Sequence, residues 1–142
     1  MRTILLMAHL MAVAIGTGMS FGNYVNLRHA AGEAGERAAS LAALRRTVAR
    51  IGDVVITLIW VSGLALLWVW IAQDGPALGG WFYAKLGFVV LLTGCHALAR
   101  HTAGLMARSG NAALIGRVQL LAAGVWLSAL ASIGLAVMAF GS

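Results

Sequence analysis

Three ionisable side chains stand inside long apolar runs of this sequence, namely His9, Lys85 and His96. Ionisable groups are costly within a lipid bilayer, so those that occur there commonly mark cofactor ligands, substrate sites or proton pathways. An imidazole on a membrane helix is a common ligand of haem iron. We therefore expect His9 to be a metal ligand, to the iron of a haem. We expect Lys85 to hold a carboxylate or relay protons, and His96 to pass protons.

Each of these residues also has a structural alternative. His9 could hydrogen-bond to a neighbouring helix, and Lys85 could extend to the lipid headgroups. His96 lies one helical turn before Arg100, so the two could form a polar pair at the membrane boundary. At about 1.5 Å per residue, His9 and His96 lie about 14 Å apart in depth. We therefore do not expect them to bind one iron from opposite sides.

The arginines form a second group of candidates. Arg45, Arg46, Arg50 and Arg117 could hold the propionates of haem or of another acidic tetrapyrrole at the membrane boundary. The alternative is that they only set the orientation of the chain in the membrane. Asp53 is expected to pair with Arg50 or its neighbours.

A copper site is a further possibility at the start of the chain. Met7, His9 and Met11 place soft ligands near one another. However, positions i and i+2 of a helix point to different faces, so this arrangement is a weak indication of a metal site.

Four apolar spans must position these residues. The chain has 142 residues, of which 61% are hydrophobic and 10% are charged, whereas soluble domains have about 25% charged residues. The apolar blocks cover residues 4–27, 51–72, 81–100 and 117–140, and each reaches the length of about 20 residues that a bilayer requires. The sequence thus predicts an all-α integral membrane bundle of four transmembrane helices, forming a single domain over residues 1–142.

The basic residues predict the orientation of this bundle. Eight of the ten Lys and Arg residues lie within or beside segments 28–50 and 101–116, which are expected to be cytoplasmic loops. This places a multi-pass protein in the bacterial inner (cytoplasmic) membrane with both termini outside. Because the cations flank apolar spans, we expect them to meet membrane lipids and not nucleic acid.

Smaller patterns predict where the helices begin and pack. Ser40 could cap an extension of the second helix that begins near Leu41. Gly18 and Gly22 form a pair of small residues one turn apart that would allow a close helix contact. Gly124, Ser128, Ser132 and Ala136 form a similar stripe on the last span.

The third span carries a recognisable pattern. Trp81 is followed by Lys85 and Leu86, and His96 comes later with Gly94 two residues before it. This pattern resembles the helix-three signature of the four-helix membrane protoporphyrinogen oxidases (the HemJ type). More loosely, the chain resembles the copper-resistance D-like membrane proteins.

The other three spans resemble the family more weakly, through a few residues each. His9 resembles the early histidine of that family, Arg45 and Arg46 an arginine pair entering helix two, and Arg117 the arginine that opens helix four. The resemblance implies a haem b on His9, a tetrapyrrole near Lys85 and Arg117, and oxidation of protoporphyrinogen IX to protoporphyrin IX.

The sequence also departs from the family pattern. Where the family has an Asn-Glu-x-Pro run after the helix-four arginine, this chain has residues 119–122 (QLLA). Losing a glutamate removes a proton acceptor. The alternatives to a haem-binding redox protein are therefore a non-catalytic accessory or assembly subunit of a larger membrane complex or homo-oligomer, and a copper-handling protein.

Overall fold

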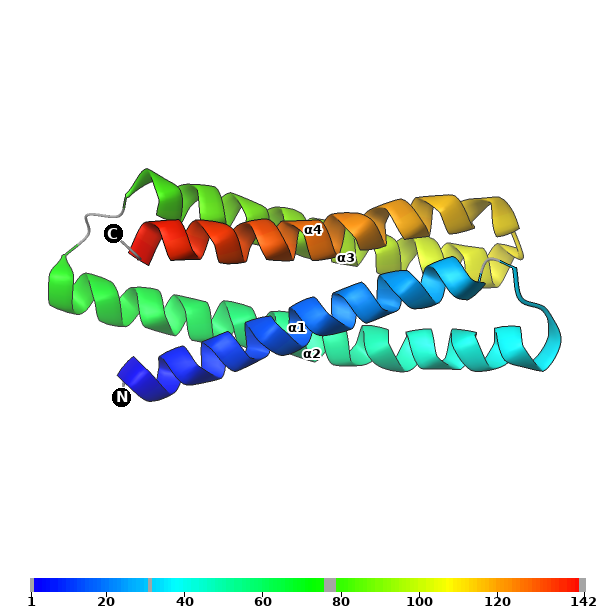
Figure 1. Ribbon diagram of the computed structural model, residues 1–142, viewed down its shortest axis with the longest axis horizontal. Helices are drawn as coiled ribbons and strands as arrows, with labels where there is room; N and C mark the ends of the chain where they lie inside the picture. Colours follow the sequence, from blue (N-terminus) through cyan, green and yellow to red (C-terminus); the bar gives the residue numbers. More distant parts are fainter. Residues whose placement is uncertain (1, 31, 76–78, 141–142) are drawn as a thin grey trace.

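The computed structural model describes residues 2–30, 32–75 and 79–140. Four long helices follow one another, α1 (Arg2–Ala30), α2 (Gly35–Asp74), α3 (Gly80–Ser109) and α4 (Ile115–Phe140), with one 3-10 turn, η1 (Ala112–Leu114), before the last. They form an elongated bundle in which the start of α1 and the end of α4 lie at the same end (Figure 1). The predicted all-α bundle of four helices is confirmed.

Each of the four helices is long and apolar enough to cross a membrane. Their outer faces carry large apolar side chains, such as Ile4, Trp68 and Leu120, which are more than 70% exposed. Such a surface is stable against lipid hydrocarbon and not against water. The chain is therefore a multi-pass membrane protein.

Helix α2 begins earlier than the sequence pattern predicts. Its first residue is Gly35, and Ala34 stands at the N-cap without a side-chain hydrogen bond. Ser40 therefore lies inside the helix, and its predicted role as a cap is wrong. The residues after Gly35 are mainly Ala, Leu, Arg and Glu, which are strong helix formers, so the helix continues back to the nearest glycine.

Helix α3 likewise continues through most of the segment expected to be a loop, as far as Ser109. Gly110 ends it in the left-handed conformation (φ 66°), with its N–H donating to the carbonyl of Met106 at 3.0 Å. The amide oxygen of Asn111 then accepts from the N–H of Ala113 at 3.0 Å and opens η1. The connection to α4 is therefore short, and both basic ends of α2 and α3 are helical.

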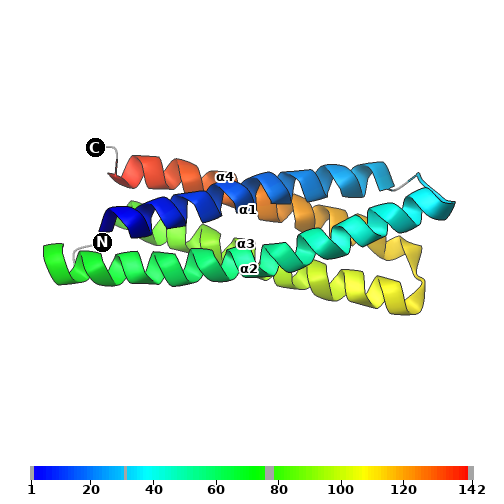
Figure 2. The ribbon, with the colours of Figure 1, turned by 90° about the horizontal axis from the view of Figure 1, so that it is seen from below.

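The helices are not packed equally. α1 packs closely against α2, α3 against α4, and α1 against α4 (Figures 1 and 2), whereas over the described ranges the backbones of α2 and α3 hardly approach each other. Contact between these two helices therefore depends on side chains that span the gap.

Small residues set the close contacts between helices. The predicted positions are right for α4 and wrong for α1. On α4, Ser128 and Ser132 are buried, and a Cβ on Gly124 would lie 3.0 Å from the sulfur of Cys95 on α3. Gly18 and Gly22 face open space, so their predicted role in close packing within the chain is wrong. The tight position on α1 is Gly16, two residues before Gly18 and on a different face of the helix. The reason is the rotation of α1 about its axis, which residue spacing does not specify.

Candidate functional site

A cavity of about 920 Å³ runs between the four helices. Pockets that hold cofactors and small molecules measure about 300–1,000 Å³, so its size suits such a ligand. Most of its walls are apolar. The candidate residues that line it are His9, Lys85, His96, Arg45 and Arg46. Arg117 is exposed at the start of α4 and does not line this cavity.

His9 is buried on α1 and hydrogen-bonded to α2. Its Nδ1 lies 2.8 Å from the hydroxyl oxygen of Ser62, and that hydroxyl lies 2.5 Å from the carbonyl oxygen of Leu58. The Ser62 proton is donated to the carbonyl, so the Ser62 oxygen accepts from the N–H at Nδ1 of His9. In this tautomer the imidazole proton is on Nδ1, and Nε2 carries the lone pair that would bind a metal or a proton.

The ring of His9 lies against the backbone of α2. A Cβ added at Gly63 would lie 3.3 Å from Cε1 of His9, which is a tight contact. Ser62 thus orients the ring and Gly63 makes room for it. Sequence analysis did not identify either residue, although a Ser-Gly pair within an apolar span is a visible signal.

Two cations lie at the same end of the bundle as His9. Lys85 on α3 lines the cavity, and its positive charge disfavours a second proton on the His9 ring. The guanidinium of Arg2 lies 5.5 Å from the centre of the Trp70 ring on α2, which is cation–π geometry. This end of the cavity can therefore hold an anionic group beside the imidazole.

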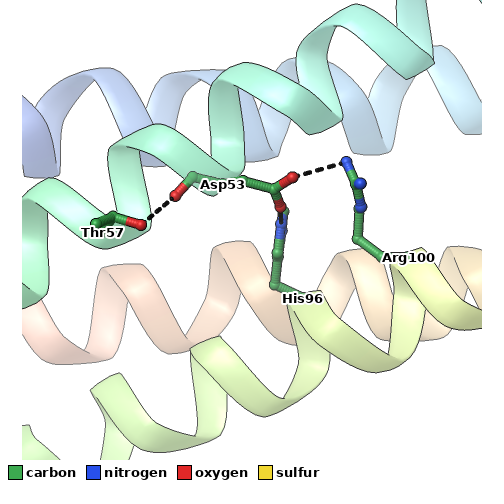
Figure 3. A network of polar contacts seen from close by, with 4 residues as sticks. All are labelled: Asp53, Thr57, His96 and Arg100. Carbon is green, nitrogen blue, oxygen red and sulfur yellow. Dashed lines mark hydrogen bonds and ion pairs between the residues drawn. The ribbon is translucent and has the colours of Figure 1, made fainter.

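A second polar cluster joins α2 to α3 (Figure 3). The Nε2 of His96 lies 2.8 Å from one carboxylate oxygen of Asp53, and Nη1 of Arg100 lies 2.9 Å from the other. The prediction that Asp53 pairs with Arg50 or its neighbours is therefore wrong. Arg50 lies on the same helix, whereas the Asp53 side chain reaches across to α3 and joins His96 to Arg100.

The gap between α2 and α3 is closed by such polar contacts. The His96 ring lies over Gly52, where an added Cβ would be 3.0 Å from its Cε1. Further along, the indole N–H of Trp60 donates to the hydroxyl of Thr93 at 3.0 Å. Trp60 therefore also links the two helices.

The two histidines occupy different levels of the bundle. His9 bonds at Ser62 and His96 at Asp53, and these α2 residues are about 14 Å apart along the helix axis at 1.5 Å per residue. The two imidazoles therefore do not face a common point. One histidine therefore lies towards each end of the cavity.

The remaining metal-ligand candidates are not brought together. Met7 and Met11 are about 60% exposed on α1, whereas His9 is buried. His29 and His101 are exposed. Within residues 2–30, 32–75 and 79–140, no group of three or more His, Cys, Asp or Glu side chains is arranged to hold a metal ion.

No protein-family model, curated protein or solved structure matches this chain.

Proposed function

We propose that this protein binds haem b within the membrane and acts as a redox protein, with His9 as an axial ligand. The observation that carries the proposal is the state of His9. It is a buried imidazole inside a membrane helix, it lines a cofactor-sized cavity, and its Nδ1 is held by Ser62.

The surroundings of His9 suit a haem. Histidines that bind a metal usually donate their other N–H to an oxygen, and this hydrogen bond fixes the orientation of the ring. Here the hydroxyl oxygen of Ser62 is that acceptor. Lys85 and Arg2 line the same end of the cavity and would neutralise propionates. Arg45 lies 17 residues before Ser62 on α2, about 25 Å along the axis, too far to reach a propionate of the same haem.

Bound haem b would supply one-electron chemistry. Around it the chain would hold the iron through His9, keep the imidazole in one tautomer through Ser62, and exclude water with apolar walls. A narrower proposal is oxidation of protoporphyrinogen IX to protoporphyrin IX, in which six electrons and six protons leave the substrate and the electrons pass to an acceptor from outside the chain. There Lys85 would hold a propionate, and His96, bonded to Asp53, would pass protons towards the basic end.

We further propose that the basic end faces the cytoplasm. This orientation places the protein in the bacterial inner membrane with both termini outside, as the distribution of arginines favours. His9 and Lys85 would then lie nearer the outer surface, and the Asp53 cluster nearer the cytoplasm.

The test is an absorption spectrum of the protein purified after expression with ample haem. We expect a Soret band that shifts on reduction with dithionite. His9→Ala should lose that band, whereas His29→Ala, which alters an exposed histidine, should keep it. Ser62→Ala should lower haem affinity by about 10–100-fold, the usual effect of losing a partner of the ligand.

Two outcomes would contradict the proposal. Full haem binding by His9→Ala would refute the ligand assignment. A colourless wild-type protein that is well folded would favour the accessory-subunit alternative. In that case the open faces of Gly18 and Gly22 on α1, which meet nothing within this chain, would be the first surface to examine for a partner helix.

A further inference from the structure

Three arginines at the basic end of the cavity have no part in the proposed haem site. Arg45, Arg46 and Arg50 lie on α2 and line the cavity. At 1.5 Å per residue they are about 18–25 Å from Ser62 along the helix axis. A group bound at His9 therefore leaves this end of the cavity available.

The charge at this end is not balanced by the protein. Arg45 is half-buried, and the like charge of Arg46 beside it acts on it unfavourably. In the described ranges, the arginines of the basic end that pair with carboxylates are Arg37, with Glu33, and Arg100, with Asp53. Arg45, Arg46 and Arg50 thus favour an anion from outside the chain.

Asn23 on α1, a buried hydrogen-bond acceptor, lies at the same level of the bundle as these arginines. The contact of Gly16 with Val55 sets the register of the antiparallel helices α1 and α2. Seven residues further on α1, and seven back on α2, this register places Asn23 opposite Val48. Asn23 lines the cavity, and its buried amide oxygen has no hydrogen-bond donor. A ligand that carries both an anion and a hydroxyl would satisfy both features.

The rest of this end is apolar and borders the gap between α2 and α3. Val48, Ala49, Ala103 and Met106 line the cavity beside the arginines. A smaller cavity of about 360 Å³ is lined by α2 and α3, and it shares His96 and Arg100 with the central one. These walls suit a hydrocarbon chain and would give no binding energy to a free phosphate ion.

We propose that the basic end of the cavity binds an anionic phospholipid. Arg45, Arg46 and Arg50 contact its phosphate, a hydroxyl of its headgroup donates to Asn23, and an acyl chain lies along the apolar walls. The site differs from a lipid annulus because Arg45 is half-buried and because Arg46 and Arg50, although exposed, line the cavity together with it. Arg28 and Arg108, at the same end, are exposed and do not line it.

The experiment measures which lipids stay bound. Protein is reconstituted in vesicles of equal parts phosphatidylglycerol and phosphatidylcholine, extracted in mild detergent, and examined by native mass spectrometry. Wild type should retain phosphatidylglycerol in preference to phosphatidylcholine. An arginine near anionic lipid contributes about fivefold in affinity, so R45Q/R46Q/R50Q should lower retention about a hundredfold. The matched control R28Q/R37Q/R108Q removes the same charge and should retain the lipid.

Three results would overturn the proposal. Equal loss of bound lipid in the two triple variants would mean general attraction to the charged surface. Equal retention of phosphatidylcholine and phosphatidylglycerol would mean an apolar groove without headgroup recognition. Displacement of the lipid by inorganic phosphate would mean a site for soluble anions. R45K/R46K/R50K keeps the charge and should keep most of the retention, which separates charge loss from misfolding. The measurement needs no haem, so its outcome is independent of the proposal for His9.

Discussion

Removal of the Asp53 carboxylate should weaken the association of α2 with α3. These helices hardly touch through their backbones, and Asp53 binds both His96 at 2.8 Å and Arg100 at 2.9 Å. Asp53→Ala would leave two polar side chains of α3 facing the gap without their carboxylate. The fold should persist because α3 remains packed on α4.

The expected cost follows from the exposure of the partners. A hydrogen bond to a charged group contributes about 1.5–3 kcal/mol, and an exposed ion pair about 0.2–1 kcal/mol. The side chain of His96 is 20% exposed, whereas those of Arg100 and Asp53 are 41% and 46% exposed. We therefore assign the larger value to the His96 contact and expect Asp53→Ala to lower the free energy of unfolding by about 2–3 kcal/mol.

The assay is unfolding by SDS in mixed micelles, followed by circular dichroism. A double-mutant cycle of Asp53→Ala with His96→Ala should give a larger coupling energy than the cycle with Arg100→Ala, within the usual 0.5–3 kcal/mol, roughly, for contacting residues. Thr57→Val is the control, since the Thr57 hydroxyl binds only the main-chain carbonyl of Asp53. Additive effects with His96→Ala, or an equal loss in Thr57→Val, would refute the reasoning.

Glycine substitutions test the close contacts with the same unfolding assay. Gly52→Ala places a Cβ 3.0 Å from the His96 ring and should cost about 1–2 kcal/mol, whereas Gly94→Ala meets nothing and should gain about 0.5–1 kcal/mol. Gly16→Ala places a Cβ 2.9 Å from Cγ1 of Val55 on α2 and should cost about 1–3 kcal/mol, whereas Gly18→Ala meets open space and should be neutral or stabilising. Equal effects within either pair would contradict the packing described for α2 or α1.

Most of the fold could be predicted from the sequence. The four apolar blocks anticipate the four helices, because the requirement for about 20 apolar residues per span is a local property of the chain. The helix ends were less predictable. Segments 28–50 and 101–116 are polar enough to be loops, yet their helix-forming residues let α2 and α3 extend well beyond the apolar spans. Polarity alone does not tell a loop from a helix that leaves the membrane.

Residue type pointed to the candidate residues, but the sequence did not show which side chains would contact them. His9, Lys85 and His96 are conspicuous because ionisable groups are rare in apolar spans. Their environments depend on Ser62, Gly63 and Asp53, which lie far away in the sequence. Arg117 was singled out by its resemblance to a family pattern, and it lies outside the cavity.

Sequence by itself determined that this chain spans a membrane four times, with most of its cations at one end and a few ionisable groups between. Those conclusions follow from transfer energies, which each segment carries with it wherever it packs. Tertiary structure decided which histidine meets serine and which meets aspartate, and it left α2 and α3 apart so that a cavity remains. These outcomes depend on the rotation and spacing of the helices, which are set by how all four pack together.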